Sequence, residues 1–315
     1  MADSTCPRGL IADLITPIGP NGAVDRPGLD RILDRVLQHV QGVLLCGPDA
    51  GEGAALGQSQ RLDVLLSAIN RVNGCVPLII WITCNTQEET CSMLEVLEKG
   101  VEKEGYTGQI FWLDTPLVYH SNRGLPQHLK DLASFSSRPI ILFNDPERVK
   151  RVAGPLKRGN IRTAILKETA LVEGVSGLIF RGALDRARNY QKAVRFRSGF
   201  PLYDGDEGQF LSHPSRHGVL SAGVNLAPAA WQRITASSLG MTDEEQRYPD
   251  HLKRIWELGR YLEALRGIYA EEPARLIREA LDLAGVFEPA ASPEELRRED
   301  PVHRLHDLMK QHGDA

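Results

Sequence analysis

The chain has 315 residues, a formal net charge of −4 and a hydrophobic fraction of 42%. This composition is ordinary for a globular protein, and it lacks the basic surplus typical of nucleic-acid binding. No run approaches the ~18 apolar residues that span a membrane, and no signal peptide is visible, so we expect a cytoplasmic protein without a membrane partner. The five cysteines include no CxxC pair, which argues against a disulfide framework and against a zinc site.

Eight short apolar runs recur over the first 225 residues, as expected for strands that are buried on both faces. They are Leu10–Pro17, Val43–Gly47, Pro77–Thr83, Gln109–Asp114, Pro139–Asp145, Thr163–Thr169, Phe200–Asp206 and Gly218–Asn225. Helical patterns alternate with them, as at residues 25–40, 58–72 and 86–99. The alternation predicts an α/β fold, a parallel (β/α)₈ TIM barrel, with an open doubly wound sheet as the alternative.

The pattern changes near residue 241, where two helical stripes of apolar residues follow at positions 252–265 and 276–283. No strand-like run follows residue 225. We therefore expect a barrel over residues 1–240 and a C-terminal helical domain over residues 241–315. The final segment, Ala291–Ala315, is highly charged and interrupted by proline, so we expect a weakly packed helix there.

Lys167 is the most conspicuous chemical candidate, because barrel enzymes carry their reacting groups at the C-terminal ends of strands. It lies in the apolar run AILKETA. Burial of a lysine disfavours the ammonium form and supplies the neutral amine that a Schiff base needs. The alternative is a structural ion pair, for example with Glu168.

Two other patterns are weaker. The glycine-rich segment after the second predicted strand matches neither a P-loop nor a GxGxxG motif, but its free backbone N–H groups suit a carboxylate. His213 and His217 lie four residues apart, and the intervening Pro214 argues against a metal pair. We expect no metal and no separate cofactor.

Taken in order, the motifs resemble the dihydrodipicolinate synthase / N-acetylneuraminate lyase family over about residues 9–287. The similar segments are LITPIGPNGAVDRPGL, FNDPER at Phe143–Arg148, AILKE at 164–168, the Gly205-Asp206 pair, Gly218–Asn225 and PARLIREALDLAG. The resemblance implies that Lys167 is the Schiff-base nucleophile and that Arg148 binds a second carboxylate. It also implies substrate contacts from Ala50, Gly51, Gly205, Asp206 and Ser221.

Several departures from the family pattern concern proton transfer. Phe143 stands where the family has a tyrosine, and Asp49 and Ala50 stand where it has two threonines. Val118 replaces an interface tyrosine unless Tyr119 substitutes for it. Loss of one acid–base group costs ~10²–10⁴-fold in rate. Asp49 is the candidate replacement, although an anion there repels a 2-oxo acid unless it is protonated or paired.

These observations leave two main hypotheses. The first is a Schiff-base lyase or aldolase of altered specificity that acts on pyruvate or a related 2-oxo acid, with an aldehyde as a candidate second substrate. The alternative is a catalytically impaired relative that binds a small acid or has a regulatory or structural role. Authentic dihydrodipicolinate synthase activity is a weaker third option. The resemblance also implies a homo-oligomer, either a dimer or a tetramer.

Overall fold

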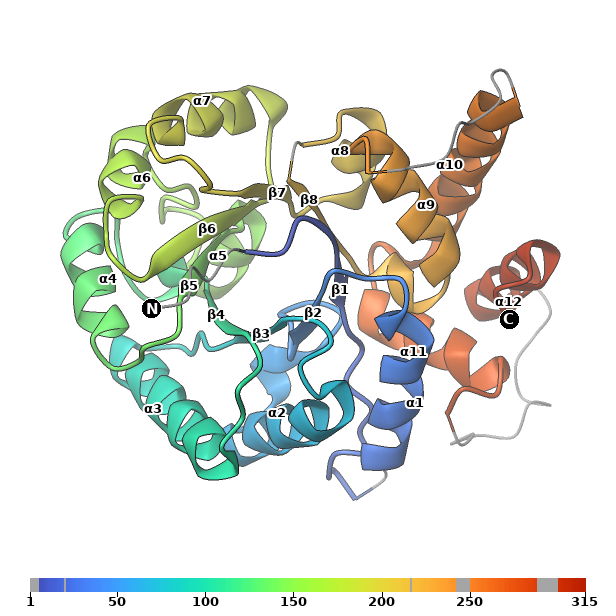
Figure 1. Ribbon diagram of the computed structural model, residues 1–315, viewed down its shortest axis with the longest axis horizontal. Helices are drawn as coiled ribbons and strands as arrows, with labels where there is room; N and C mark the ends of the chain where they lie inside the picture. The colour runs from blue at the N-terminus through green and yellow to red at the C-terminus, as the bar shows by residue number, and fades with distance from the viewer. Residues whose placement is uncertain (1–5, 20, 216, 242–249, 288–299) are drawn as a thin grey trace.

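The computed structural model describes residues 6–19, 21–215, 217–241, 250–287 and 300–315. Within them, eight parallel strands close into a barrel in chain order, and β8 pairs with β1 (Figure 1). The strands are β1 Gly9–Asp13, β2 Gly42–Leu45, β3 Leu78–Trp81, β4 Ile110–Asp114, β5 Ile140–Asn144, β6 Val175–Phe180, β7 Leu202–Asp204 and β8 Gly218–Ser221. The prediction of a TIM barrel is confirmed, and the open-sheet alternative is wrong.

The helices of the barrel part surround the strands (Figure 1). They are α1 Arg26–Leu37, α2 Gln58–Val72, α3 Gln87–Glu104, α4 Leu125–Ala133, α5 Pro146–Ala153, α6 Thr163–Thr169, α7 Leu184–Val194, α8 Glu207–Ser212 and α9 Pro228–Ser238. Short 3₁₀ turns lie at Gly53–Ala55, Pro116–Val118 and Gly223–Asn225. The Asp25 cap read from the sequence is present, since its Oδ1 accepts a hydrogen bond from the Gly28 N–H at 3.0 Å.

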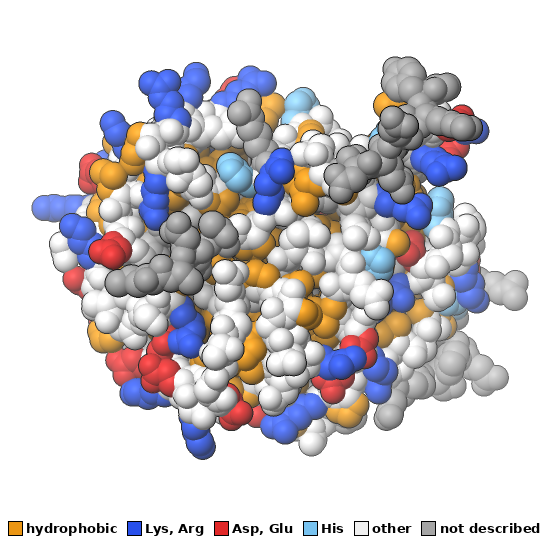
Figure 2. Space-filling view, viewed as in Figure 1, with side chains coloured by type: hydrophobic (Ala, Val, Ile, Leu, Met, Phe, Trp, Pro, Cys, Tyr) orange, Lys and Arg blue, Asp and Glu red, His pale blue; other side chains and the backbone are white. Residues whose placement is uncertain are grey.

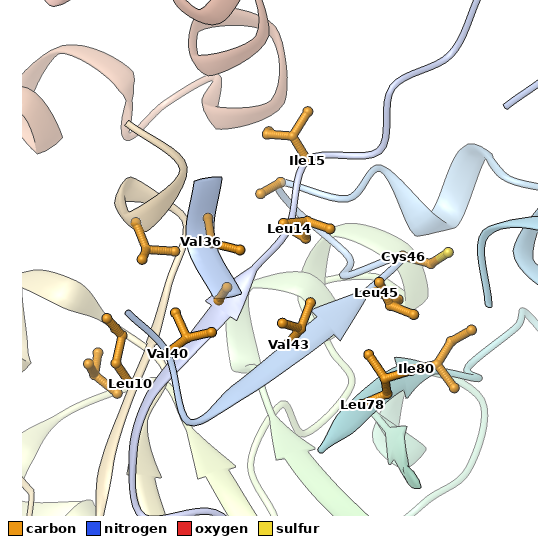
Figure 3. Packing of buried hydrophobic residues seen from close by; sticks show 14 of the residues in the cluster. Leu10, Leu14, Ile15, Val36, Val40, Val43, Leu45, Cys46, Leu78 and Ile80 are labelled. Carbon is orange, nitrogen blue, oxygen red and sulfur yellow. The ribbon is translucent and has the colours of Figure 1, made fainter. Parts of the chain in front are cut away.

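Alternation along each strand divides the core into two layers. Leu10, Val43 and Leu45 point outward, and Figure 3 shows them in one packed cluster with Val36 of α1 and with Val40. The residues between them point inward and belong to a separate cluster that fills the barrel. That cluster comprises Ile11, Leu44, Ile79, Trp81, Phe111, Leu113, Ile141, Phe143, Ile179, Tyr203 and Leu220. The barrel is therefore packed along its axis, and chemistry is confined to its ends.

The sixth strand differs from the prediction. Thr163–Thr169 forms helix α6, and the strand is the later run Val175–Phe180. Short apolar runs do not distinguish a strand from a buried helical segment, and here the stretch Ala164–Leu166 fitted both. Its buried residues, Leu166 and Thr169, lie on one side of a helical turn.

The C-terminal helices α10 Asp250–Tyr269, α11 Pro273–Leu283 and α12 Pro301–His312 lie together on one side of the barrel (Figure 1). Helix α10 packs against α8 and α9, and α12 packs against α10 and α11. Their apolar residues join the outer core cluster, so they continue the barrel's packing. The division of the chain at residue 240 into two domains stays a prediction.

The expectation of a weakly packed final helix is wrong for the described residues 300–315. Val302, Leu305 and Met309 of α12 are completely buried. We expect Met309→Ala to lower the free energy of unfolding by ~2–5 kcal/mol, because it leaves a cavity in this packing. Met309→Leu, which conserves volume, serves as the control and should cost less than ~1.5 kcal/mol. Urea unfolding measures both, and equal stability of the two variants would contradict close packing of α12.

Charged side chains of both signs lie mainly around the edge of the face shown in Figure 2, and apolar side chains are visible toward its centre. Among the residues that the structure describes, no helix combines the length and apolar character needed to cross a bilayer.

Candidate functional site

A cavity of about 360 Å³, here called the mouth cavity, opens at the C-terminal ends of the strands. Its walls come from the segments that follow β1, β2, β5, β6, β7 and β8, and from the junction between α10 and α11. This is the end of a TIM barrel that carries active sites. Its lining includes four arginines and five acidic residues: Arg148, Arg151, Arg181, Arg266, Asp13, Asp49, Asp206, Glu207 and Glu271.

Arg181 is the centre of an ion network in this cavity. It directly follows β6, and its Nη1 lies 2.6 Å from Asp49 Oδ2 and 2.9 Å from Asp145 Oδ2. Its Nε donates to the Gly205 carbonyl at 3.0 Å. The guanidinium also lies over the ring of Phe143, 5.5 Å from the centroid. A fixed cation thus occupies the space above the residue where the family pattern has a tyrosine.

The network favours the charged forms of Asp49 and Arg181. Burial by itself raises the pKa of Asp49, but Arg181 and Arg148 outweigh it and hold that pKa below its usual value. Burial likewise opposes the charge of Arg181, yet Asp49 and Asp145 raise the pKa of Arg181 further. The condition placed on Asp49, that it be protonated or paired, is met by pairing.

Arg148 is less available than the resemblance implies. It is only 6% exposed, and its Nη2 donates to the Pro48 carbonyl and to Asp49 Oδ1. The guanidinium lies over Trp81, 5.4 Å from the ring centroid. Its Nε has no hydrogen-bond partner among the described residues. Arg148 therefore lines the mouth cavity with its Nη2 engaged and its buried Nε without a partner among the described residues.

The interior position nearest the mouth on β6 is occupied by Ile179, which is completely buried. It pairs in register with Phe143, and a Cβ on Gly205 would lie 3.1 Å from Ile179 Cγ2 and 3.2 Å from Phe143 Cε2. Three apolar groups thus meet at the mouth ends of β5, β6 and β7, at the position where the resemblance places a tyrosine. Neither Ile179 nor Phe143 can accept or donate a proton.

The predicted position of Lys167 is wrong. It lies on α6, is exposed, and lines a shallow surface groove with residues of α7. All nine lysines of the sequence are among the described residues, and none lies on a barrel strand or lines the mouth cavity. Only Lys157 is half-buried, and its Nζ donates to the Val118 carbonyl at 2.8 Å.

The other predicted binding residues have structural partners. Ala50 and Gly51 are buried and are not part of the mouth cavity's lining, so their backbone does not form the expected carboxylate site. Asp206 lines the cavity and caps α8, since its Oδ1 accepts a hydrogen bond from the Gln209 N–H. The same Oδ1 lies 3.4 Å from Arg266 Nη2. Ser221 is buried and donates to Glu207 Oε1 at 2.6 Å.

Asp13 is the residue of this site that sequence reasoning missed most clearly. It ends β1, is 4% exposed and lines the mouth cavity, and its Oδ1 has no hydrogen-bond partner among the described residues. A Cβ at Gly47 would lie 2.0 Å from this oxygen, so glycine there leaves room for the carboxyl. Burial, helped by the carboxylates of Asp49 and Glu207, raises the pKa of Asp13 to about 7, although Arg181 and the Ala50 amide oppose the rise.

This raised pKa predicts a pH effect on stability. Because the folded state holds the Asp13 proton more tightly than the unfolded state, the stability from this group falls as pH rises from the ordinary carboxyl range to about 7. Asp13→Asn removes the loss, so we expect the variant to exceed wild type in unfolding free energy by a few kcal/mol near pH 8 and by much less near pH 4. Urea unfolding at both pH values tests this, and a difference independent of pH would contradict it.

The hydroxyl groups of Tyr119 and Tyr203 do not replace the missing tyrosine. Tyr119 donates to Asp114 Oδ2 at 2.7 Å and lies outside the mouth cavity's lining. Tyr203 points into the barrel and donates to the Pro7 carbonyl, at the opposite end from the mouth. Val118 lines a separate cavity of about 510 Å³ beside α2 and α3. The proton relay of the family pattern thus has no counterpart among these groups.

Arg181 would have been identified from the sequence if β6 had been placed correctly, because the residue that follows a barrel strand lies at the mouth. Glu207 lay in the segment after β7 and was passed over. It is buried, and its carboxylate accepts hydrogen bonds from Ser221, the Gly223 N–H and Tyr269. Across the described part of the chain, no group of three or more His, Cys, Asp or Glu residues is arranged to hold a metal ion.

Comparisons with known proteins agree with the barrel. The model of the dihydrodipicolinate synthetase family matches residues 6–297. The 4-hydroxy-tetrahydrodipicolinate synthase of Thiobacillus denitrificans is 28% identical over 232 residues, covering 72% of this chain and 73% of the relative. The synthase of Methanococcoides burtonii is 25% identical over 285 residues and 89% of each chain.

Solved structures show the same fold. A dihydrodipicolinate synthase described as the first monomeric variant superposes with a TM-score of 0.78 at 22% identity, over 98% of this chain and 97% of that chain. The pyruvate complex of the synthase from Acinetobacter baumannii gives a TM-score of 0.76 at 19% identity, over 98% and 100%. With the family model matched over most of its length, the chain belongs to the dihydrodipicolinate synthetase family.

Proposed function

We propose that this chain is a family member that binds a small polar acid non-covalently at the mouth of the barrel and does not use Schiff-base chemistry. The observation that carries the proposal is the position of the lysines, all of which lie outside the barrel strands and the mouth cavity. Imine formation needs a neutral amine beside the substrate carbonyl. A site without such an amine can still bind and select a ligand.

Arg181 supports the same conclusion. A guanidinium stays protonated under all physiological conditions and is a poor nucleophile, so it cannot take the part of a reactive lysine. It is well suited to hold carboxylates, and it already holds those of Asp49 and Asp145. The charged side chains at this end of the barrel are therefore suited to bind a charged ligand.

A pyruvate-dependent lyase or synthase activity is the second candidate function. Membership of a family whose curated relatives are synthases favours it, and so does Arg148 at the edge of the mouth cavity. A coupled assay with pyruvate and aspartate semialdehyde separates the two candidates. Turnover in wild type that is lost in Lys167→Ala would overturn the non-covalent proposal.

Ligand titration provides the positive test. We expect small carboxylic acids that bind the site to raise the melting temperature equally in wild type and in Lys167→Ala, with no turnover in either. A protein that none of these acids stabilises would favour the regulatory or structural role instead. We expect the same stabilisation in wild type and in Lys167→Ala because Lys167 is exposed on α6, outside the mouth cavity.

We also propose a homo-oligomer, either a dimer or a tetramer, on the strength of family membership. The family does not fix the assembly, since one solved relative is described as a monomeric variant. Sedimentation velocity measures the mass in solution, and a monomer at all accessible concentrations would contradict this part of the proposal.

A further inference from the structure

We propose that the ligand of the mouth cavity carries a cationic amine beside its carboxylate, as an α-amino acid does, and that Asp13 binds this amine. The inference rests on the proposed function, because it assumes a site that binds without a Schiff base. It goes further by replacing the 2-oxo acid expected for the family with a zwitterion.

The starting observation is a buried carboxyl group that the chain compensates only in part. Asp13 is more than nine-tenths buried, lines the cavity and makes no ion pair among the described residues, and its Oδ1 has no hydrogen-bond partner there. The Ala50 amide and the charge of Arg181 offset only part of the cost of burying this carboxyl group, and a cationic group that enters the cavity would remove more of it.

No cation forms an ion pair with Asp13 among the described residues, although the nearby charge of Arg181 partly offsets its burial. The Nη1 of Arg181 is occupied by Asp49 and Asp145. Glu207, which also lines the cavity, receives its hydrogen bonds from two hydroxyl groups and a backbone N–H, so it has no cationic partner in the described chain. An ammonium group beside Asp13 would therefore be attracted by two carboxyl groups, and a 2-oxo acid carboxylate placed there would be repelled.

The carboxylate of the ligand has candidate partners in the same cavity. Arg151 lines it, is exposed and makes no ion pair within the described residues. Arg148 also lines the cavity, and its buried Nε has no hydrogen-bond partner among the described residues. A guanidinium binds a carboxylate with directed hydrogen bonds. A small molecule with a carboxylate and an ammonium group can therefore bind these arginines and Asp13 at the same time.

A divalent metal ion fits Asp13 less well than an amine. Hard cations such as Ca²⁺ take ~6–8 oxygen ligands, and both oxygens of Glu207 already accept hydrogen bonds. The described residues also lack any cluster of three metal-binding side chains. An ammonium group needs only a few hydrogen-bond acceptors.

The experiment compares pairs of molecules that differ only at the α-carbon: alanine with pyruvate, aspartate with oxaloacetate, and glutamate with 2-oxoglutarate. Isothermal titration calorimetry near pH 8 measures each pair on wild type, Asp13→Asn and Asp63→Asn. Asp63 is a half-exposed aspartate on α2, away from the mouth cavity, and is the matched control. We expect at least one amino acid to bind wild type and Asp63→Asn at least about tenfold more tightly than its 2-oxo partner.

In Asp13→Asn that preference should fall by about tenfold or more, while the melting temperature shows that the variant is folded. Amino-acid binding unchanged by Asp13→Asn would overturn the inference, and so would the failure of all three amino acids to bind. Preferred non-covalent binding of a 2-oxo acid would overturn it and leave the proposed function standing. A covalent pyruvate adduct would overturn the proposed function itself.

Discussion

Arg181→Ala is expected to lower the free energy of unfolding by ~3–5 kcal/mol. The substitution removes the cation shared by Asp49 and Asp145, and Asp145 is only 1% exposed. Two carboxylates then face each other at the mouth without that compensation, although Arg148 still contacts Asp49. Urea unfolding near neutral pH measures the loss.

The control for this effect is Arg151→Ala, which removes an exposed arginine from the same cavity. We expect it to change stability by no more than ~0.5 kcal/mol. Adding Asp49→Asn and Asp145→Asn to Arg181→Ala should recover part of the loss, because these residues are coupled. If Arg181→Ala were as stable as Arg151→Ala, the ion network would not be a structural element of the mouth.

Ile179→Lys combined with Phe143→Tyr is expected to create the reactive amine that the chain lacks. The inward-facing end of β6 is occupied by Ile179, and its neighbour in register is Phe143. A lysine in this apolar enclosure has a lowered pKa and a larger neutral fraction, which is the form that attacks a carbonyl. After incubation with pyruvate and reduction with borohydride, we expect a single covalent adduct on the variant and none on wild type.

Ile179→Met, also combined with Phe143→Tyr, is the matched control because it places an unbranched chain without an amine at the same position. It should give no adduct, and peptide mapping should place the adduct of the lysine variant at residue 179. Circular dichroism checks that both variants are folded. A folded lysine variant without an adduct would contradict the expectation that a lysine at this end of β6 reaches the mouth cavity.

Much of the fold could be predicted from the sequence. Strands buried on both faces appear as continuous apolar runs, and seven of the eight predicted runs coincide with observed strands. The sixth was misplaced by 12 residues at its start, because Thr163–Thr169 combines an apolar run with a Lys-Glu pair that resembles the family motif. The true strand, Val175–Phe180, ends at Arg181 and contains no lysine.

The candidate site was less accessible to prediction, and the misplaced strand is only part of the reason. Asp49 and Arg181 are 132 positions apart, and their contact exists only because the barrel closes. Asp13 was read as part of an apolar strand, and nothing local in the sequence indicates that one oxygen of its carboxyl group is buried without a partner. Phe143 and Asp49 were recognised as departures from the family pattern, and the structure supplies the reason that Asp49 is tolerated.

The most direct test of the account is the intact mass of the wild-type protein after incubation with pyruvate and reduction with borohydride. Because no lysine is among the described residues that line the mouth cavity, we expect the mass to stay that of the unmodified chain. A stoichiometric pyruvate adduct on a single lysine, mapped to Lys167, Lys157 or any other, would contradict it.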